Sequence, residues 1–314
     1  MKLAFIIDPL DALNPKKDSS LDFMLEALRR GHQVSVFEYS DVRSRDGRVF
    51  ARSTAVTAEV VALTAGTAVR RAGTPAVVPL SEFQFVFIRK DPPFDTQYLA
   101  LTYLLDVASG ETRFVNSPRG LREVNEKLFA NRYAQHAPST VVTWDLEEAR
   151  SFAAGHTKVV LKPTFLGSGS GVFLTSVQDE NFEQLFRTVL RMESLGPVVV
   201  QAYMPEGKAG DTRVFLLDGE PVAALGRRPP ENDFRANVAQ GGTAFATTLS
   251  ATQASIAREL GVELKQAGIV FAGLDFIGDR LIETNVTSPT LIQELRRLSG
   301  FDMSKTLLDH LGIV

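Results

Sequence analysis

Two carboxylates and one amide near the C-terminus have the types and spacing to bind a metal ion. Asp275 lies in a β-rich run, Glu283 and Asn285 lie two residues apart in a second run, and Gly278 and Asp279 between the runs are turn residues. This pattern predicts a β-hairpin. Because side chains alternate between the two faces of a strand, Glu283 and Asn285 share one face, and antiparallel pairing can bring Asp275 to the same face.

Three oxygen ligands without His or Cys suit Mg²⁺, which takes a few protein carboxylates and completes its shell with waters and phosphates. The alternative is a solvated hairpin whose polar face happens to be acidic. The hairpin by itself favours neither interpretation.

Upstream of the hairpin, a lysine and a Gly/Ser loop lie between two predicted strands. Lys162 follows a buried strand (159–161), residues 167–171 read Gly-Ser-Gly-Ser-Gly, and another strand follows at 172–175. The bare N–H groups of such a loop can wrap anionic oxygens, so the pattern is typical of a phosphate-covering hairpin. The loop matches neither the Walker pattern nor the dinucleotide fingerprint, and a plain turn is the alternative.

The N-terminal third predicts an α/β domain with a mostly parallel sheet. A strand at 2–7, a helix that Asp18 caps, and a strand at 33–37 make a βαβ start. A buried strand at 83–88 then runs into Arg89, at the edge where such sheets bind ligands. Residues 40–79 show no clean period.

The pattern changes after residue 122. We expect residues 125–129 on a helix. The other predicted strands lie at 140–143, 197–201, from 211 onward and at 220–225, and the other predicted helices lie at 182–192, 252–268 and 303–311. The long loop at 227–242, rich in Pro, Gly and Arg, is of a kind that is usually functional.

Composition limits the function classes. The 314 residues suggest about two domains, and 44% hydrophobic and 23% charged residues are ordinary for a soluble enzyme. The net charge of -3 favours neither nucleic acid nor an anionic membrane as partner, and the absence of Cys excludes thiolate catalysis and Cys-ligated metals. The first strand is too short for a signal peptide and no run is long enough to span a bilayer, so we expect a cytoplasmic protein.

Several segments together resemble one known family. They are residues 14–20 (Asn-Pro-Lys-Lys-Asp-Ser-Ser), 89–96 (Arg-Lys-Asp-Pro-Pro-Phe-Asp-Thr), 125–129 (Asn-Glu-Lys-Leu-Phe), 235–237 with 241–242, and 273–290. The chain resembles the prokaryotic glutathione synthetases, which are ATP-grasp carboxylate–amine ligases. The resemblance implies an N-terminal α/β domain at 1–122 and an ATP-grasp domain at 123–314, whose two α+β lobes (123–203 and 204–314) clasp ATP.

The resemblance also implies roles for single residues. The residues expected to bind ATP are Lys127, Lys162, Gly167, Ser168, Gly169, Gln201, Ala202, Tyr203, Met204 and Asp211. The residues expected to hold the peptide substrate are Arg89, Arg227, Ser288, Pro289 and Thr290; the last three form a segment at a helix start, where free N–H groups can bind a carboxylate. The expected catalytic residues are Arg213, Arg235 and Asn237. Asp275, Glu283 and Asn285 match the ligands of two Mg²⁺ ions, with Mn²⁺ as an alternative.

The activity implied is ligation of γ-glutamylcysteine to glycine through an acyl phosphate, with ATP converted to ADP and phosphate. No nucleic-acid or membrane partner is expected, and family analogy implies a homo-oligomer, a tetramer. The family usually has Lys-Pro-Leu-Asp-Gly-Met-Gly-Gly in its phosphate loop, whereas residues 162–171 read Lys-Pro-Thr-Phe-Leu-Gly-Ser-Gly-Ser-Gly. This departure leaves open another ATP-grasp amino-acid or peptide ligase. A non-catalytic ATP-binding scaffold is the alternative from a different class, and no general base for the incoming amine is obvious.

Overall fold

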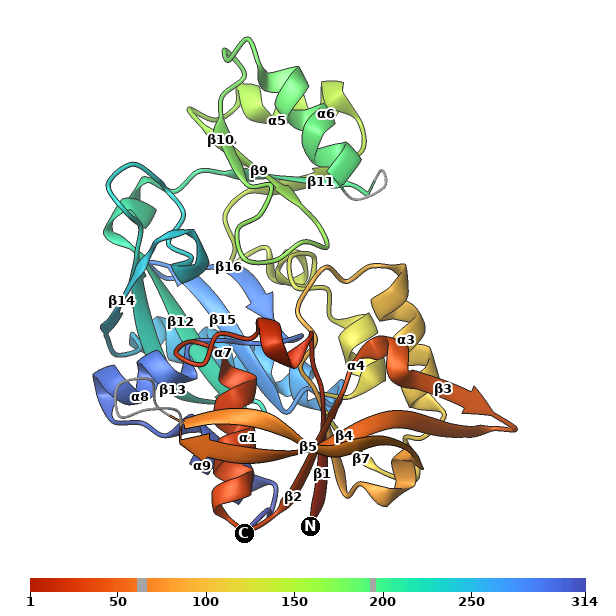
Figure 1. Ribbon diagram of the computed structural model, residues 1–314. Coiled ribbons are helices and arrows are strands. Elements are labelled where there is room, and N and C mark those ends of the chain that lie inside the picture. The colour runs from red at the N-terminus through yellow and green to blue at the C-terminus, as the bar shows by residue number, and fades with distance from the viewer. Residues whose placement is uncertain (61–66, 193–195) are drawn as a thin grey trace.

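The computed structural model describes residues 1–60, 67–192 and 196–314, which form three β-sheets with helices packed on them (Figure 1). The N-terminal sheet lies at the bottom of the view, a small lobe lies at the top, and a C-terminal lobe lies at the left. None of the described helices has the length and apolar character that a membrane span requires.

The N-terminal sheet has seven strands. They are β1 (Lys2–Ile6), β2 (Gln33–Phe37), β3 (Val42–Arg45), β4 (Arg48–Val60), β5 (Thr67–Pro79), β6 (Phe85–Ile88) and β7 (Arg113–Val115). β1 pairs in parallel with β2 and β6, and β6 pairs in parallel with β7. The predicted parallel core is therefore confirmed, and β3, β4 and β5 extend it by antiparallel pairing.

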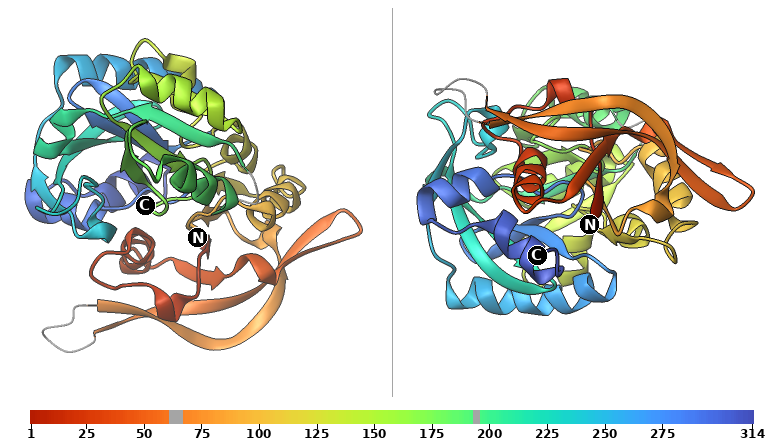
Figure 2. Two further views of the ribbon diagram at one scale, coloured as in Figure 1. Left: turned by 90° about the horizontal axis from the view of Figure 1, so that it is seen from above. Right: turned by 60° about the horizontal axis from the view of Figure 1, so that its bottom comes forward.

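Strands β4 and β5 form the long ribbon that the sequence pattern did not reveal. The ribbon runs along the side of the molecule away from the small lobe (Figure 2). Its register shifts between Ser53 and Ala55, so the buried positions change from Val49 and Ala51 to Val56. A bulge of this kind interrupts the period-two alternation by which strands are recognised. Residues 61–66 of this segment lie outside the described residues.

Among the described residues, three helices cover the N-terminal sheet, namely α1 (Ser19–Arg29), α3 (Thr96–Asp106) and α4 (Pro118–Glu123). The carboxylate of Asp18 accepts a hydrogen bond from the Leu21 N–H at 2.9 Å, and that of Asp95 accepts one from the Tyr98 N–H at 2.8 Å. These N-caps satisfy backbone donors that the first helical turn leaves free, and they set where α1 and α3 begin.

The small lobe is an antiparallel sheet with two helices on one face. Its strands are β8 (Thr140–Thr143), β9 (Val159–Pro163), β10 (Phe173–Thr175) and β11 (Val198–Ala202), in the order β10-β9-β11-β8, and its helices are α5 (Leu146–Ala154) and α6 (Phe182–Met192). Phe182, Phe186 and Val189 on α6 are buried at spacings of three and four residues, so one face of this helix closes the core of the lobe.

The C-terminal lobe is a five-stranded antiparallel sheet. Its strands are β12 (Asp211–Leu217), β13 (Glu220–Arg228), β14 (Thr243–Ala246), β15 (Phe271–Ile277) and β16 (Arg280–Asn285), in the order β14-β13-β12-β15-β16. Its helices are α7 (Ala251–Gln266), α8 (Ile292–Ser299) and α9 (Met303–His310). The predicted metal hairpin is β15 and β16.

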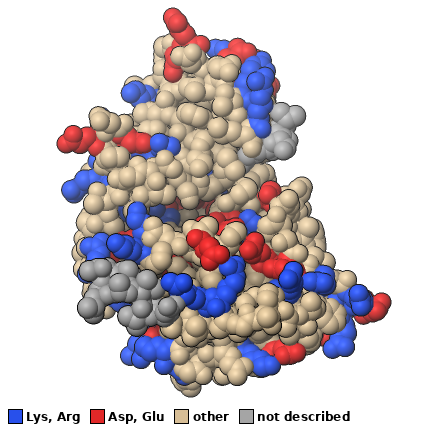
Figure 3. Space-filling view, viewed as in Figure 1, with Lys and Arg blue, Asp and Glu red and all other residues tan. Residues whose placement is uncertain are grey.

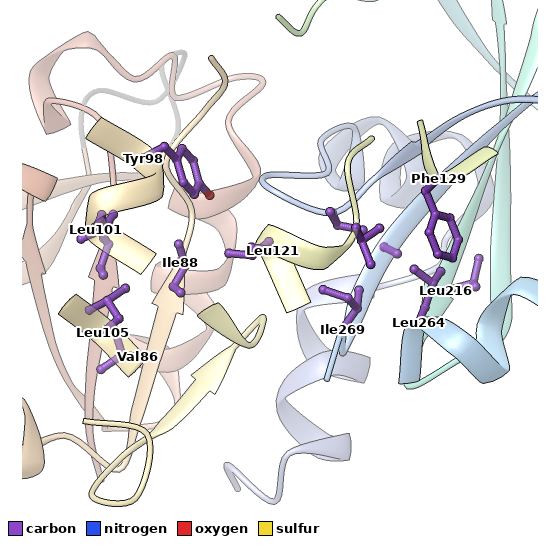
Figure 4. Packing of buried hydrophobic residues seen from close by; sticks show 14 of the residues in the cluster. Val86, Ile88, Tyr98, Leu101, Leu105, Leu121, Phe129, Leu216, Leu264 and Ile269 are labelled. Atoms are coloured by element: carbon purple, nitrogen blue, oxygen red, sulfur yellow. The ribbon is translucent and has the colours of Figure 1, made fainter. Parts of the chain in front are cut away.

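One apolar core runs from the N-terminal sheet into the C-terminal lobe. Figure 4 shows Leu121 on α4 between a group around Ile88 and Tyr98 and a second group around Phe129 and Ile269. Asn116, just after β7, adds hydrogen bonds between the N-terminal domain and the C-terminal lobe. Its side-chain oxygen accepts hydrogen bonds from the N–H groups of Val270 and Phe271, and its amide nitrogen donates to the carbonyls of Phe271 and Val286.

Two local predictions were wrong. Residues 125–128 do not lie on a helix: residues 126–128 form a turn that leads into the 3-10 helix η4 (Phe129–Tyr133). The Asn125 side chain accepts from the N–H groups of Lys127 and Leu128, and its carbonyl accepts from the Phe129 N–H, as in a helix N-cap, but the helical turn does not continue as an α-helix. Residues 288–290 do not start a helix either, because α8 begins at Ile292 after Leu291 in the left-handed region.

Candidate active site

The hairpin brings its three oxygen ligands together as the alternation predicts. Asp275 lies opposite Glu283 and Gly273 lies opposite Asn285, so the three side chains project from the same face. The amide nitrogen of Asn285 donates a hydrogen bond to Oδ2 of Asp275 at 3.1 Å. The group therefore lies on adjacent strands of a rigid sheet rather than on a loop.

Two arginines from the neighbouring strands converge on Asp275. Arg213 on β12 donates two hydrogen bonds of 2.8 Å to the Asp275 carboxylate, and Arg227 on β13 lies 2.9 Å from it. Arg227 also donates two hydrogen bonds of 2.7 Å to Asp211. Burial alone would raise the pKa of Asp275, but the two guanidinium groups outweigh it and hold that pKa well below its ordinary value. Asp275 is therefore ionised at neutral pH.

The two predicted nucleotide lysines face this group from the other side. The ammonium of Lys127 lies 3.1 Å from Oε1 of Glu283 and donates to the carbonyl of Leu166 at the start of the phosphate loop. Lys162 on β9 is half-buried and donates to the side-chain oxygen of Gln201 at 2.7 Å. Loss of solvent around its ammonium group lowers the pKa of Lys162 to about 8, because this effect, with the nearby Lys127 charge, outweighs the attraction of Glu283 and Asp275.

The Gly/Ser loop between β9 and β10 packs against the loop after β13. Arg235 donates to the carbonyl of Gly169 at 3.0 Å, and Gln240 donates to that of Ser168 at 3.1 Å. Gly169 has a φ of +75°, and a Cβ there would lie 2.9 Å from the Asn237 side chain. Glycine is therefore needed at this position both for its backbone conformation and for the close approach of Asn237.

Most of the predicted site residues line two adjoining cavities. Those around the smaller one, of about 110 Å³, are Lys127, Lys162, Gly169, Gln201, Ala202, Tyr203, Met204, Asp211, Arg227, Arg235, Asn237, Asp275 and Glu283. Those around the larger one, of about 350 Å³, are Gly167, Ser168, Arg213, Arg227, Asn237, Glu283, Asn285, Ser288 and Thr290. Arg227, Asn237 and Glu283 line both, so the cavities meet at these three side chains. Charged side chains of both signs lie close together on the surface beneath the small lobe (Figure 3).

The smaller cavity lies between the small lobe and the C-terminal sheet. Tyr203 and Phe234 line it and pack edge to face, with ring centroids 6.4 Å apart. Gln201 and Ala202 end β11, and Tyr203 and Met204 continue into the connection to the C-terminal lobe. Apolar walls with backbone groups at one end and two lysines at the other suit a flat base carrying phosphates.

Two predicted substrate residues lie behind the cavities. Neither Arg89 nor Pro289 lines either cavity in the described part of the chain. The Arg89 guanidinium is buried and donates to the carbonyl of Pro289 at 2.9 Å and to the hydroxyl of Ser20 at 3.2 Å. Its place in the structure is therefore to support the 288–290 segment. Ser288 itself donates a hydrogen bond to the carboxylate of Asp91.

Four acidic residues that line the larger cavity were not predicted as site residues, namely Asp18, Asp91, Glu126 and Glu294. Oε1 of Glu126 accepts hydrogen bonds from the Val286 N–H at 2.9 Å, from the Thr287 N–H at 3.1 Å and from the Thr287 hydroxyl at 2.8 Å. Burial raises the pKa of Glu126, and the nearby Glu283 carboxylate raises it further. Its position between Asn125 and Lys127 in a family segment was the available signal.

The oxygen donors of the hairpin fit a divalent cation. Asp275, Glu283 and Asn285 offer the hard ligands that Mg²⁺ prefers, and Glu283 faces both cavities. The set has only two carboxylates, and no cluster of three or more His, Cys, Asp or Glu side chains suited to a metal occurs among the described residues. A metal here would therefore depend on further oxygens from bound phosphate or water, which is the usual behaviour of Mg²⁺.

Comparisons with known proteins match nearly the whole chain to one family. Residues 1–122 match the family model for the prokaryotic glutathione synthetase N-terminal domain, and residues 126–300 match the model for the prokaryotic glutathione synthetase ATP-grasp domain. The chain is 39% identical over 314 residues to a glutathione synthetase of Synechocystis sp., covering 98% of both chains. It is 40% identical over 313 residues to that of Synechococcus elongatus, covering 96% of this chain and 94% of the relative.

Solved structures of lower identity share the fold. D-cycloserine synthetase DcsG superposes with a TM-score of 0.67 at 18% identity, covering 99% of this chain and 98% of that one. The ATP-grasp ligase PsnB, complexed with a minimal precursor, superposes with a TM-score of 0.60 at 18% identity and 99% coverage of both chains. At this identity the likeness concerns the fold alone.

Proposed function

This chain belongs to the prokaryotic glutathione synthetase family, and we propose that it joins γ-glutamylcysteine to glycine with the conversion of ATP to ADP and phosphate. The alternative of a non-catalytic scaffold has less support, because a protein that only binds ATP has no need of a second, larger cavity that shares charged side chains with the nucleotide cavity.

The observation that carries the proposal is the meeting of the two cavities at Arg227, Asn237 and Glu283. A carboxylate becomes reactive toward an amine only when its oxygen takes up the terminal phosphoryl group of ATP. The two substrates must therefore lie in adjoining sites whose shared wall neutralises phosphate oxygens. That shared wall consists of the Arg227 guanidinium, the Asn237 amide and the Glu283 carboxylate, which is one of the expected metal ligands.

We assign the nucleotide to the smaller cavity. Its base lies against Tyr203 and Met204, and Lys127 and Lys162 neutralise its phosphates, since both ammonium groups face the same cavity from different elements. The backbone N–H groups of residues 167–169 cover the phosphates. Asp275, Glu283 and Asn285 hold divalent cations, which supply charge neutralisation at the phosphate oxygens. Two Mg²⁺ ions are part of this proposal.

Arg213, Arg235 and Asn237 have the role of stabilising charge during acyl transfer. We assign the acid substrate to the larger cavity, which Arg213 and Asn237 line, whereas Arg235 lines the smaller, nucleotide cavity. A guanidinium fixed in advance by Asp275 or Asp233 needs no reorganisation when charge develops on the phosphate or on the tetrahedral oxyanion. The segment 288–290, which Arg89 supports, borders the larger cavity, where the acid substrate binds.

The proposal includes a division of the chain at residues 122/123 into an N-terminal domain and an ATP-grasp domain, with the ATP-grasp lobes meeting at residues 203/204. It also includes a homotetramer in the cytoplasm, by analogy with the family.

The test is phosphate release from ATP with Mg²⁺ and γ-glutamylcysteine, with and without glycine, with the product identified by mass spectrometry. We expect glycine-dependent release and a product of the mass of glutathione. The phosphate loop at residues 162–171 differs from the usual sequence of the family. This difference supports one alternative function, that of a related ligase with another acid and amine. Activity with a different acid or amine, and none with glycine, would support that alternative and refute the substrate assignment.

A further inference from the structure

The phosphate loop between β9 and β10 is held by groups outside its own lobe. The carbonyl of Phe165 accepts a hydrogen bond from the N–H of Phe94 at 3.1 Å, and the carbonyl of Leu166 accepts one from the ammonium of Lys127. The loop after β13 binds the carbonyls at positions 168 and 169. The N-terminal domain and the C-terminal lobe therefore both help to set the position of the phosphate loop.

Phe165 meets the N-terminal domain at an apolar wall. It borders a small cavity of about 40 Å³ together with Phe94, Leu121 and Val124. These three residues belong to the apolar core that joins the N-terminal sheet to the C-terminal lobe, or pack against it. Counted from Lys162, the family usually has Asp at position 165, so an apolar side chain here replaces a charged one where the loop meets this core.

The segment 91–94 reaches from this contact to the larger cavity. Asp91 and Pro92 line the larger cavity, and the Asp91 carboxylate accepts a hydrogen bond from Ser288. Pro92 also approaches the phosphate loop so closely that a Cβ at Gly167 would lie 2.9 Å from Cγ of Pro92. Four consecutive residues thus connect the residues assigned to the acid substrate with the loop assigned to the phosphates of ATP.

We propose that Phe165 is a positioning residue that fastens the phosphate loop to the N-terminal domain, so that acid substrate in the larger cavity strengthens the binding of ATP. This inference rests on the proposed function for the places of the two substrates. An acid that orders the segment 91–94 also orders the loop fastened to it. ATP then binds to a loop that has already lost its conformational freedom, which makes the two ligands cooperative.

Phe165 acts through the loop and does not contact the substrates. It lines neither substrate cavity in the part of the chain that the structure describes. Its substitution by Asp would place a charge against Leu121, Val124 and the ring of Phe94, and that charge is better solvated when the loop leaves this wall. Phe165→Asp therefore releases the loop, whereas Phe165→Leu keeps an apolar side chain at the contact and is the matched control.

The test is calorimetric titration with Mg²⁺ and AMPPNP, a non-hydrolysable ATP analogue, in the absence and presence of saturating γ-glutamylcysteine. For the wild type and Phe165→Leu we expect the acid to lower the Kd for AMPPNP about 5-fold or more, within the usual range of coupling between two sites. For Phe165→Asp we expect a ratio near one. Equal ratios for the wild type and Phe165→Asp would overturn the proposal.

Steady-state kinetics separates positioning from folding. At saturating acid, Phe165→Asp should raise the KM for ATP by the fold-change that the titration gives and leave kcat close to that of the wild type, since the groups that contact the substrates are unchanged. A partly unfolded enzyme would show a lower kcat, an unchanged KM and a lower melting temperature. This second pattern would refute the positioning role of Phe165.

Hydrogen exchange of the ligand-free protein keeps this inference separate from the proposed function. Amides of residues 164–169 should exchange at similar rates in the wild type and Phe165→Leu, and faster in Phe165→Asp. If γ-glutamylcysteine does not bind to the wild type, the proposed function fails, and faster exchange in Phe165→Asp still supports the anchoring role of Phe165. Equal exchange in all three proteins would overturn that role, whichever acid the enzyme uses.

Discussion

The ammonium group of Lys127 lies 3.1 Å from Oε1 of Glu283, and this ion pair joins the turn before η4 to the hairpin β15–β16. Both side chains are largely buried and both line the nucleotide cavity. Lys127 also donates to the Leu166 carbonyl, so a single residue connects the hairpin with the start of the phosphate loop. Binding of the triphosphate and its cations is expected to replace this pair by contacts of each partner with the ligand.

Glu283→Gln should abolish turnover while the protein stays folded. The change keeps the shape of the side chain but removes the charge shared by the two cavities. Since the loss of even an outer partner of a metal ligand typically costs about 10- to 100-fold in metal affinity or activity, we expect a larger loss in kcat here. Phosphate release at increasing Mg²⁺ measures it. Wild-type turnover at an ordinary Mg²⁺ concentration would show that Glu283 is not a metal ligand.

Arg235→Ala should impair carboxylate activation far more than ATP binding. Arg235 is held by Asp233 and contacts the Gly169 carbonyl, so its guanidinium is fixed against the phosphate loop in the smaller cavity. We expect kcat to fall roughly 10²- to 10³-fold, as for removal of one donor to a developing oxyanion. Calorimetric ATP titration should give a nearly unchanged Kd. Unchanged turnover at saturating ATP would contradict this role.

The affinity for ATP should fall as the pH rises above about 8, where Lys162 of the free enzyme loses its proton. Burial lowers the pKa of Lys162, whereas bound phosphates favour the ammonium form and raise it. ATP binding near pH 8 is therefore accompanied by proton uptake at Lys162.

Titrations in buffers of different ionisation enthalpy measure this uptake. The matched control is Lys162→Arg, which keeps the positive charge throughout this pH range and should remove both the uptake and the pH dependence. The same pH dependence in Lys162→Arg would assign it to another group.

Asn116→Ala should destabilise the junction between the N-terminal domain and the C-terminal lobe. The substitution leaves two buried N–H groups and two carbonyls without their side-chain partner. With each buried unmade hydrogen bond costing about 1–3 kcal/mol, we expect the free energy of unfolding to fall by about 3 kcal/mol or more.

Denaturant unfolding of Asn116→Ala beside Asn232→Ala, an exposed position, measures this difference. If the two variants unfold at the same denaturant concentration, water or neighbouring groups replace the hydrogen bonds of the Asn116 amide.

Local chemistry made a large part of the fold predictable. Helix α6 has the predicted limits because its apolar residues recur at helical spacing. The N-cap hydrogen bonds of Asp18 and Asp95 reach only three residues along the chain. The turn at Gly278 and Asp279 likewise involves only neighbouring residues. The common face of Asp275, Glu283 and Asn285 follows from the period of two in a strand. These features depend on neighbours along the chain, so the sequence contains them directly.

Other features depend on contacts between distant segments. The bulge at Ser53–Ala55 broke the alternation of β4, and the segment 125–128 forms only a turn before the 3-10 helix η4. Resemblance to the family named Arg89 as a substrate residue, whereas the folded chain places it behind the 288–290 segment. Glu294 had no local signal of its own, since a lone Glu is most often a solvated surface residue, and Glu126 was marked only by its place in a family segment.

The sequence by itself thus determined most of the strands, the caps, the ligand-bearing hairpin and the family. Only the tertiary structure decided that Arg227, Asn237 and Glu283 line both cavities and that Lys127 meets Glu283. It alone also decided that Oε2 of Glu294 is buried with no hydrogen-bond partner among the described residues. The physical reason is that hydrogen bonding within a turn, helix or hairpin is set over a few residues. The burial and pairing of a charge depend on which distant elements pack around it.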